Sequence, residues 1–180
     1  MDIYMGSLLV GENAESPSPF DFALGGKGGN AILPLGACGE KIKQGNAIMV
    51  DMAGNYGPWM TDMTRVFSVG KLSDLAYKAH EVSREIHEVI KQTAKQGTPC
   101  ADLYNIAMDL TKKNDLEAYF MGTKLQAKFV GHGVGLEINE PPVLTPRSKE
   151  VFVSNTVFAL EPKFVIPNVG AVGVENTYLV

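Results

Sequence analysis

The sequence has little of what marks a secreted, membrane-spanning or nucleic-acid-binding protein. It has only two cysteines, Cys38 and Cys100, which lie far apart and in no CxxC pair, so we expect reduced thiols in a cytoplasmic protein. It has no apolar run long enough to span a bilayer, and its first residues do not form a signal peptide. Lys and Arg number 16 against 20 Asp and Glu, which gives a net charge of −4. We therefore expect no general attraction to nucleic acid or to anionic membranes.

The composition is that of one globular domain. Apolar residues make up 45% of the 180, enough for a substantial core, and no linker divides the chain. We therefore expect residues 1–180 to form a single domain. The glycine-rich segment 25–30 has no Lys-Ser/Thr pair after it, so it is interpreted as a turn and not as a phosphate-binding loop.

The spacing of apolar residues predicts an α+β fold. Strands are expected at residues 3–10, 20–24, 46–54 and 59–67. Apolar residues at helical spacing over 75–90 predict a helix with Ser73 as its N-cap. Thr98-Pro99 is expected to begin a second helix, as a cap followed by proline at the first helical position. After about residue 117 the chain returns to strands and loops.

A short internal repeat indicates two related halves. Residues 45–51 and 154–161 each run through an apolar strand into an acid, and a turn and a further acid follow in both cases. Two acid-bearing hairpins, one in each half, would explain the repeat.

The acids of these hairpins end strands that read as buried. Asp51, Glu161 and Glu175 each directly follow an apolar run. An ionised carboxylate in such a place costs several kcal/mol unless it is paired. Taken singly, each acid could equally lie exposed at a strand end.

The spacing predicts that these acids come in opposed pairs. A turn at Tyr56-Gly57 would place Asp51 directly opposite Asp62, and a turn around Asn168 would place Glu161 opposite Glu175. Opposed β-carbons lie about 4.5–5.5 Å apart, so both pairs need a counter-charge.

Divalent metal ions are the counter-charge that fits best. Lys163 is two residues from Glu161 and could reach it, whereas Arg65 is expected on the opposite strand face from Asp62. His132, between two glycines that allow close backbone approach, would add an imidazole ligand. Its alternative interpretation is a histidine in a surface loop.

Five segments carry these candidates in a fixed order along the chain. They are Met49–Gly54, Thr61–Arg65, Gly131–Glu137 with Glu140-Pro141-Pro142, Leu160-Glu161-Pro162 and Val174-Glu175-Asn176. In order and local context they resemble the metal motifs of the pita-bread metallopeptidases, of the prolidase and Xaa-Pro aminopeptidase (aminopeptidase P) type. The resemblance runs from about residue 20 to the end.

The resemblance implies a pita-bread fold, a strongly curved six-stranded antiparallel sheet covered by helices, with pseudo-twofold halves. The family's preceding helices and N-terminal domain have no counterpart ahead of Ile3, so the chain is expected to be truncated at both ends. An apolar face is then expected to be exposed.

The resemblance also implies a dinuclear metal site. Two divalent ions, most simply Mn with Co, Zn or Fe as alternatives, would be held by Asp51, Asp62, His132, Glu161 and Glu175. Asp62 and Glu175 would bridge the ions, and a hydroxide between them would attack the peptide carbonyl. Glu161 would also act as general base, and Thr64 would orient Asp62.

Two positions depart from the family pattern. Leu35 stands where a histidine usually follows a proline, and Asn139 stands where a second histidine usually follows the metal-binding one. With Glu161, these are the candidate catalytic positions, and their replacement puts activity in question more than metal binding.

The function expected is hydrolysis of Xaa-Pro bonds in short proline-containing peptides, by a protein that could form a homodimer. The alternative is a pita-bread binding module with weak activity or none. Hydrolysis of a non-peptide substrate, as in creatinase, is a third interpretation. A methionine aminopeptidase fits less well, because it would also need a histidine near Leu35.

Overall fold

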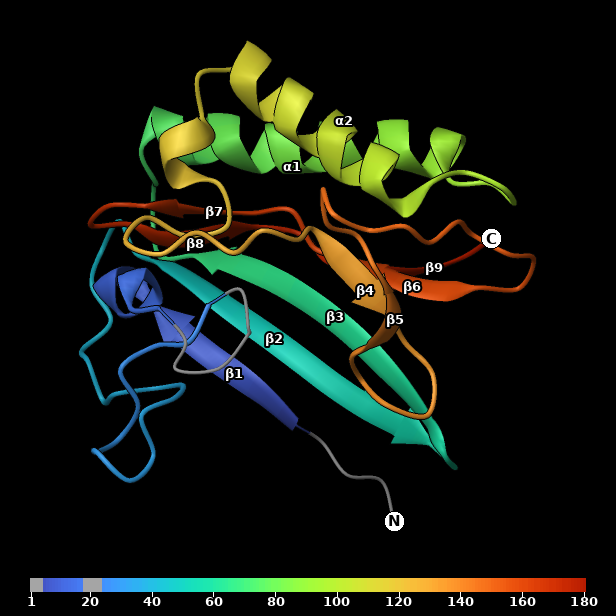
Figure 1. Ribbon diagram of the computed structural model, residues 1–180. Helices are drawn as coiled ribbons and strands as arrows, with labels where there is room; N and C mark the ends of the chain where they lie inside the picture. Colours follow the sequence, from blue (N-terminus) through green and yellow to red (C-terminus); the bar gives the residue numbers. More distant parts are fainter. Residues whose placement is uncertain (1–4, 18–23) are drawn as a thin grey trace.

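The chain forms antiparallel sheets on which two helices pack (Figure 1). A computed structural model describes residues 5–17 and 24–180. The strands are β1 (Met5–Val10), β2 (Ala47–Tyr56), β3 (Trp59–Ser68), β4 (Gly131–Gly133), β5 (Glu140–Val143), β6 (Val157–Leu160), β7 (Lys163–Ile166), β8 (Gly170–Gly173) and β9 (Asn176–Leu179). The helices are α1 (Asp74–Thr93) and α2 (Cys100–Lys113), with short 3-10 segments η1 (Gly11–Glu15) and η2 (Glu117–Tyr119). The fold is therefore of the α+β type.

Helix α1 begins where the sequence predicts. The Ser73 side chain accepts a hydrogen bond from the backbone N–H of Ala76 at 3.2 Å, which satisfies one of the free donors of the first turn. The apolar stripe of the helix, which includes Val82, Ile86 and Ile90, is buried against the strands beneath it.

Helix α2 begins one position later than predicted. Pro99 occupies the N-cap position, and the first helical residue is Cys100. The Thr98 hydroxyl donates instead to the carbonyl oxygen of Thr93 at 3.0 Å, so it closes the turn between the helices and does not cap α2. The expectation of a Thr98 cap was wrong because Thr98 lies before the N-cap residue and its Oγ1 accepts instead from the backbone N–H of Lys95 at 3.2 Å.

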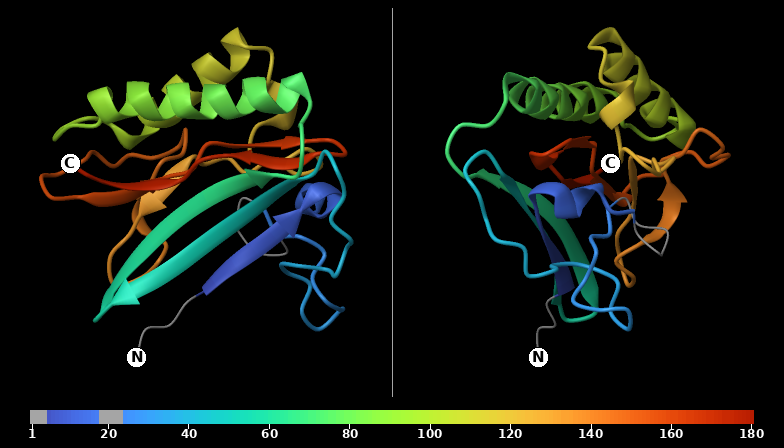
Figure 2. Two further views of the ribbon diagram at one scale, coloured as in Figure 1. Left: turned by 180° about the vertical axis from the view of Figure 1, so that it is seen from behind. Right: turned by 90° about the vertical axis from the view of Figure 1, so that its left-hand side faces the viewer.

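The elements lie in layers. The helices cover one side of β7, β8 and β9, and the β1–β2–β3 sheet lies on the other side of these strands (Figure 1; Figure 2). The core fills the space between, with Phe158, Phe164 and Leu103 fully buried.

The first sheet has the order β1–β2–β3, and its hairpin register corrects the prediction. Tyr56 pairs with Trp59, so the loop residues are Gly57 and Pro58, and Asp51 lies opposite Thr64 and not opposite Asp62. The backbone of Gly57 has a φ of 57°, the positive value that a two-residue hairpin loop requires at its first central position. Asp51 and Asp62 are consequently diagonal neighbours on one face of the sheet.

The other face of this sheet is apolar and partly open to solvent. Met52 pairs with Met63, and Ile48 pairs with Phe67 on the same face. Phe67 is 59% exposed and Leu8, on the adjacent strand, is 44% exposed. The expectation of an exposed apolar face is met at this surface.

The second half of the chain pairs differently from expectation. In place of one six-stranded sheet, the described residues form sheets β1–β2–β3, β5–β4–β6–β9 and β7–β8. Pro162, which has no N–H to donate, separates β6 from β7. Glu161 lies at this break and Glu175 lies in the gap between β8 and β9. The pairs on either side, Leu160 with Asn176 and Lys163 with Gly173, leave the two glutamates opposite each other, as predicted.

The internal repeat is visible in the backbone. Gly45 and Asn155 both have positive φ, 85° and 68°, in the turns that precede β2 and β6. Each stands at the same distance along the chain from the acid that follows, Asp51 or Glu161. The two halves therefore present their acids from equivalent turns.

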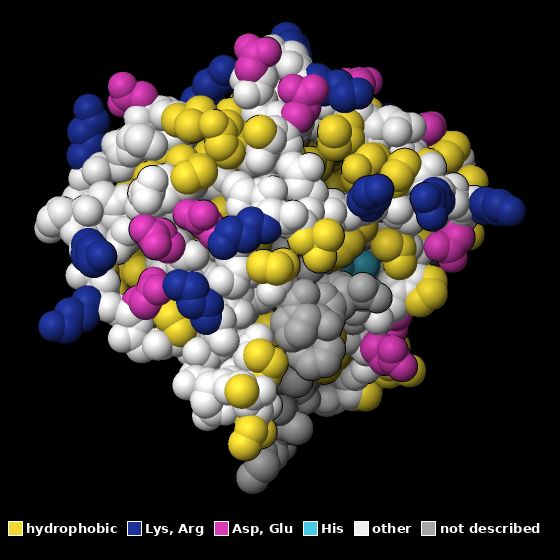
Figure 3. All heavy atoms as spheres, turned by 60° about the vertical axis from the view of Figure 1, so that its left-hand side comes forward, with side chains coloured by type: hydrophobic (Ala, Val, Ile, Leu, Met, Phe, Trp, Pro, Cys, Tyr) yellow, Lys and Arg dark blue, Asp and Glu magenta, His cyan; other side chains and the backbone are white. Residues whose placement is uncertain are grey.

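The strand predicted at 20–24 falls almost entirely outside the described residues. In the part of the chain that the structure describes, no helix has the length and hydrophobicity needed to cross a membrane. On the face shown in Figure 3, acidic and basic side chains are interspersed, in keeping with the small net charge of −4.

Candidate metal centre

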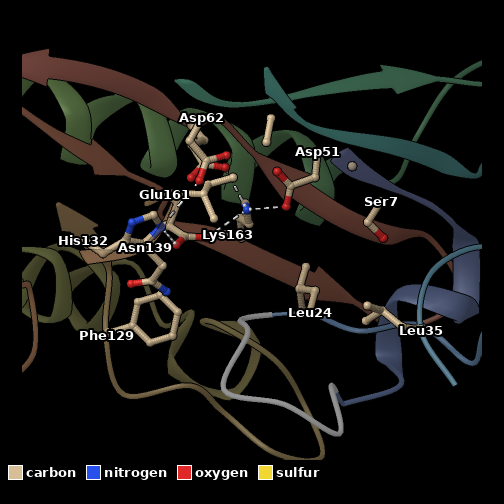
Figure 4. Close-up of a pocket in the computed structure, with 14 residues that line it drawn as sticks. Ser7, Leu24, Leu35, Asp51, Asp62, Phe129, His132, Asn139, Glu161 and Lys163 are labelled. Carbon is tan, nitrogen blue, oxygen red and sulfur yellow. Dashed lines mark hydrogen bonds and ion pairs between the residues drawn. The ribbon is translucent and has the colours of Figure 1, made fainter. Parts of the chain in front are cut away.

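A cavity of about 330 Å³ lies between the β1–β2–β3 sheet and the second half of the chain (Figure 4). Every residue that the sequence singles out for metal binding or catalysis lines it: Leu35, Asp51, Asp62, His132, Asn139, Glu161 and Glu175. Residues far apart in the sequence thus converge on one space.

The two aspartates enter from the first hairpin. Asp51 projects from β2 and retains 30% side-chain exposure, whereas Asp62, on β3, is 10% exposed. The backbone carbonyl of Asp62 accepts a hydrogen bond from the Thr177 hydroxyl at 2.9 Å, which ties β3 to β9 beside the site.

His132 enters from β4 and is buried, so the alternative of a surface loop is excluded. A β-carbon on Gly131 would collide with the carbonyl of Ala159, and one on Gly133 with the carbonyl of Pro141, so both glycines are needed for the close strand approach. His132 Nδ1 donates to the Gly133 carbonyl at 3.0 Å. In the neutral ring this leaves Nε2 as an acceptor, and it faces the cavity.

The His132 ring meets an acid from each half of the chain. Its Nε2 lies 3.4 Å from Glu161 Oε1 and 3.6 Å from Asp62 Oδ2. These separations are short enough for one small cation to contact all three groups.

Glu175 is held by β3. Its backbone N–H donates to the Thr64 carbonyl, and the Thr64 hydroxyl donates to Glu175 Oε2. Arg65 Nη1 donates to the backbone carbonyl of Glu175 at 2.7 Å. The prediction that Thr64 orients Asp62 was wrong: its hydroxyl donates to Glu175, because β3 packs against the segment that joins β8 to β9.

Lys163 is the residue that the sequence reasoning undervalued. Its side chain is 2% exposed, and its ammonium lies 2.8 Å from Glu161 Oε2, 3.1 Å from Glu175 Oε2 and 3.2 Å from Asp51 Oδ2. Proximity along the chain indicated the contact with Glu161, but not the other two. A lysine inside an otherwise apolar run was the signal that it is buried and paired.

The donor set fits a divalent cation. Asp62, His132 and Glu175 are buried and offer ligand atoms that lie within 4.8 Å of one another. Glu175 Oε2 is bonded to Thr64 and Lys163, whereas Oε1 is buried without a hydrogen-bond partner among the described residues. A buried, unpartnered carboxylate oxygen is costly, and a bound cation would satisfy it.

The pKa shifts indicate that the cluster holds more negative charge than its cationic side chains can compensate. Burial, together with the neighbouring carboxylates, raises the pKa of Asp62 to about 7 and the pKa of Glu175 to about 8. Both acids therefore retain protons near neutrality, which a metal ion would replace.

The remaining groups of the cluster are charged. Burial alone would raise the pKa of Glu161, but the Lys163 charge and the His132 hydrogen bond hold it at about 2. Burial alone would lower the pKa of Lys163, yet three acids hold it well above its usual value. Burial alone would lower the pKa of His132, but the bond to Glu161, the Gly133 carbonyl and the charge of Asp62 together raise it to about 9.

The rest of the cavity wall is largely apolar. Leu24, Phe129 and Ile138 line it together with Leu35 and Asn139. Asn139 lies near His132 and Phe129, whereas Leu35 lies at the opposite end (Figure 4). The two positions therefore flank the acid cluster.

Comparison with known proteins places this arrangement in context. The sequence profile of metallopeptidase family M24 matches residues 11–180. The Xaa-Pro dipeptidase of Pyrococcus furiosus is 30% identical over 174 residues, a match that covers 96% of this chain and 48% of the relative. The chain thus spans about half the length of the curated relatives it matches.

Solved structures show the same fold. The X-Pro aminopeptidase from Thermotoga maritima superposes with a TM-score of 0.78 at 22% identity, over 97% of this chain and 44% of that one. Prolidase from Pyrococcus furiosus gives a TM-score of 0.78 at 24% identity, over 97% and 45%. The expected pita-bread fold is confirmed.

Proposed function

The chain belongs to metallopeptidase family M24, and on that premise we propose that it carries the active site of a metal-dependent peptidase that hydrolyses Xaa-Pro bonds in short peptides. The observation that carries the proposal is the convergence of four carboxylates and one imidazole on a single cavity. Relatives at 30% and 29% identity are Xaa-Pro dipeptidases, which supports the substrate class.

The proposed ligands are Asp51, Asp62, His132, Glu161 and Glu175. Oxygen donors with one imidazole suit Mn²⁺ first, with Co²⁺, Zn²⁺ and Fe²⁺ as alternatives. When bound, such an ion polarises the scissile carbonyl and makes water more acidic. The resemblance implies two ions; how many bind depends on Lys163, whose ammonium already contacts three of the five side chains.

Glu161 is the proposed general base. Its carboxylate is ionised at neutral pH because Lys163 and His132 stabilise the charge, so it can accept a proton from the attacking water. Oxygen Oε1 faces the cavity side at His132, while Oε2 is anchored by Lys163.

Asn139 and Leu35 are the proposed substrate-side residues. The Asn139 amide can donate a hydrogen bond to a substrate carbonyl but cannot carry a proton near neutral pH. Leu35, with Leu24, provides an apolar wall that suits a proline ring. These features predict slow hydrolysis, or a preference for a substrate that fits the apolar end.

Peptide hydrolysis by the purified chain tests the proposal. We expect Mn²⁺-loaded protein to cleave Xaa-Pro dipeptides and chelator-treated protein not to. Glu161→Gln should lower the rate by about 10²–10⁴-fold, and Glu117→Gln, at an exposed position, should leave it unchanged. Absence of cleavage from any Xaa-Pro peptide by metal-loaded protein would refute the enzymatic proposal.

A binding module with little activity is the second candidate. It is favoured by Leu35 and Asn139, which replace two groups that would otherwise move protons. A protein that takes up metal and binds Xaa-Pro peptides without cleaving them would establish this function.

The proposed location is the cytoplasm, supported by the two free cysteines, and fractionation of the source cells would test it.

A further inference from the structure

The Lys163 ammonium lies where the carboxylates of both halves meet. It is the first residue of β7, and in an extended chain its side chain points to the same side as that of Glu161, two residues before. It contacts three carboxylates at 2.8–3.2 Å. An ammonium has three N–H donors, so every donor has an acid for a partner.

Two of these partners, Asp51 and Glu175, are also proposed ligands for one metal ion. A divalent ion binds carboxylate oxygens at about 2.0–2.2 Å. To share Asp51 Oδ2 and Glu175 Oε2 with the ammonium, that ion would have to lie against Nζ. Two positive charges at such separation in a buried site repel strongly. One cation therefore excludes the other from this position.

Each glutamate divides its oxygens between two positions. For Glu161, Oε2 contacts Lys163 and Oε1 faces His132. For Glu175, Oε2 contacts Lys163 and Oε1 has no partner among the residues described. The two glutamates thus bridge the ammonium to a second position, beside His132.

That second position retains a complete set of ligands. Asp62, His132 and Glu175 form a buried group with ligand atoms within 4.8 Å of one another. The ion pairs of Lys163 are made with Asp51, Glu161 and Glu175, so the ammonium does not consume Asp62 or the His132 ring.

We propose that the Lys163 ammonium takes the place of one of the two divalent ions. The chain then binds a single divalent ion, through Asp62, His132 and Glu175, with Glu161 Oε1 adjacent. This inference rests on the proposed function in so far as the site is a metal site, and it specifies the composition of that site.

Counting bound ions tests the inference. The wild-type chain, saturated with MnCl₂ and freed of excess metal, should contain one Mn per chain by elemental analysis. Its electron paramagnetic resonance spectrum should be that of an isolated Mn²⁺, without exchange coupling. Two ions per chain with a coupled spectrum would overturn the inference and leave the proposed metal site intact.

Variants at position 163 test whether the Lys163 ammonium is what limits the chain to one ion. Lys163→Gly and Lys163→Met should raise the content to two Mn per chain and produce the coupled spectrum, whereas Lys163→Arg, which keeps the charge, should stay at one. A folded Lys163→Gly or Lys163→Met chain that still binds one ion would refute the role of the ammonium. Should neither variant fold, the wild-type count remains a sufficient test.

A failure to bind metal would also be informative. If neither the wild type nor a folded Lys163 variant binds Mn²⁺ or Co²⁺, the inference and the proposed metal site fail together. His132→Ala should abolish uptake in the wild-type background, and retention of the ion in that variant would overturn the assignment of the remaining position.

Discussion

Lys163 and Asp51 stand in opposite halves of the sequence and meet inside the cavity, with Nζ 3.2 Å from Oδ2. The same ammonium contacts Glu161 and Glu175, so one buried lysine links the acids of both acid-bearing hairpins. The cluster is therefore an interface between the two halves as well as a candidate metal centre.

Metal ions are expected to stabilise the protein. Binding to the native state alone stabilises by about 2.7 kcal/mol when the ligand is in hundredfold excess over its dissociation constant. Mn²⁺ or Co²⁺ should raise the melting temperature, and a chelator should lower it. Asp62→Ala should lose this response, whereas Asp109→Ala, at an exposed position of α2, should keep it. Identical melting curves with and without metal would contradict the site.

Lys163→Met is expected to destabilise the metal-free protein. Removing one partner of a buried ion pair costs about 3–5 kcal/mol, because the other charge is left without compensation. Urea unfolding in the presence of a chelator would measure the loss. Lys91→Met is the matched control: its pair with Glu88 is exposed and screened by solvent, so its loss should change stability far less. Equal effects of the two substitutions would show that the ammonium is not essential to the cluster.

The metal-free protein is expected to lose stability as pH rises from about 4 to about 9. The pKa values of Asp62 and Glu175 are raised to about 7 and about 8, so the folded state binds more protons than the unfolded state in this window. His132 acts in the same direction. Its pKa is raised to about 9, so its stabilising contribution is complete below pH 6.5 and is lost as the pH rises towards 9. Urea unfolding at pH 5, 7 and 9 in chelator measures the trend.

Glu161 contributes in the opposite direction and at lower pH. Its pKa is lowered to about 2, so its stabilising contribution is present above about pH 4.5 and is lost only as the pH falls towards 2.

Asp62→Asn, a neutral isostere, should flatten the loss of stability between pH 5 and 9. A metal-free protein that gains stability from pH 5 to pH 8 would contradict the assignment.

Restoring the two histidines should raise peptidase activity. A positioned acid–base group typically contributes about 10²–10⁴-fold, and neither Leu35 nor Asn139 can transfer a proton near neutral pH. The double variant Leu35→His with Asn139→His should therefore raise kcat/KM for Xaa-Pro dipeptides at least tenfold in Mn²⁺-loaded protein. Ile32→His, which is 95% exposed in the same loop region, should not. If neither metal-loaded protein cleaves any peptide, the binding-module function is the better one.

The apolar outer face of β1–β2–β3 is expected to promote self-association, which also tests the proposed homodimer. Leu8 and Phe67 are 44% and 59% exposed on it. Phe67→Ser with Met63→Ser should lower the apparent mass at high concentration in sedimentation velocity, because it removes apolar surface. Val89→Ser, on helix α1, serves as the control. A wild-type chain that is monomeric at all concentrations would contradict the expectation.

The sequence predicted most of what local patterns determine. The cap at Ser73, the strands of the first hairpin and the convergence of the acids with His132 follow from periodicity and motif order. The hairpin register did not follow, because it depends on whether Gly57 occupies the first or second central position of the turn. That choice placed Asp51 opposite Thr64 and not opposite Asp62.

The role of Lys163 could not be obtained from spacing alone. Its neighbour Glu161 is close in sequence, but Asp51 and Glu175 reach it only through the packing of one half on the other. Burial of a lysine is unfavourable unless acids surround it, so the sequence argument preferred free metal ions. The folded chain supplies three such acids.

A tethered ammonium differs from a metal ion in that dilution and chelation cannot remove it. Lys163 is joined to its acids through the chain, so its effective concentration at the cluster does not depend on the supply of metal. When external ions are scarce, Asp51, Glu161 and Glu175 therefore keep a counter-charge and their mutual arrangement. The half of the centre that holds Lys163 is built during folding itself, and only the half beside His132 depends on the composition of the surrounding solution.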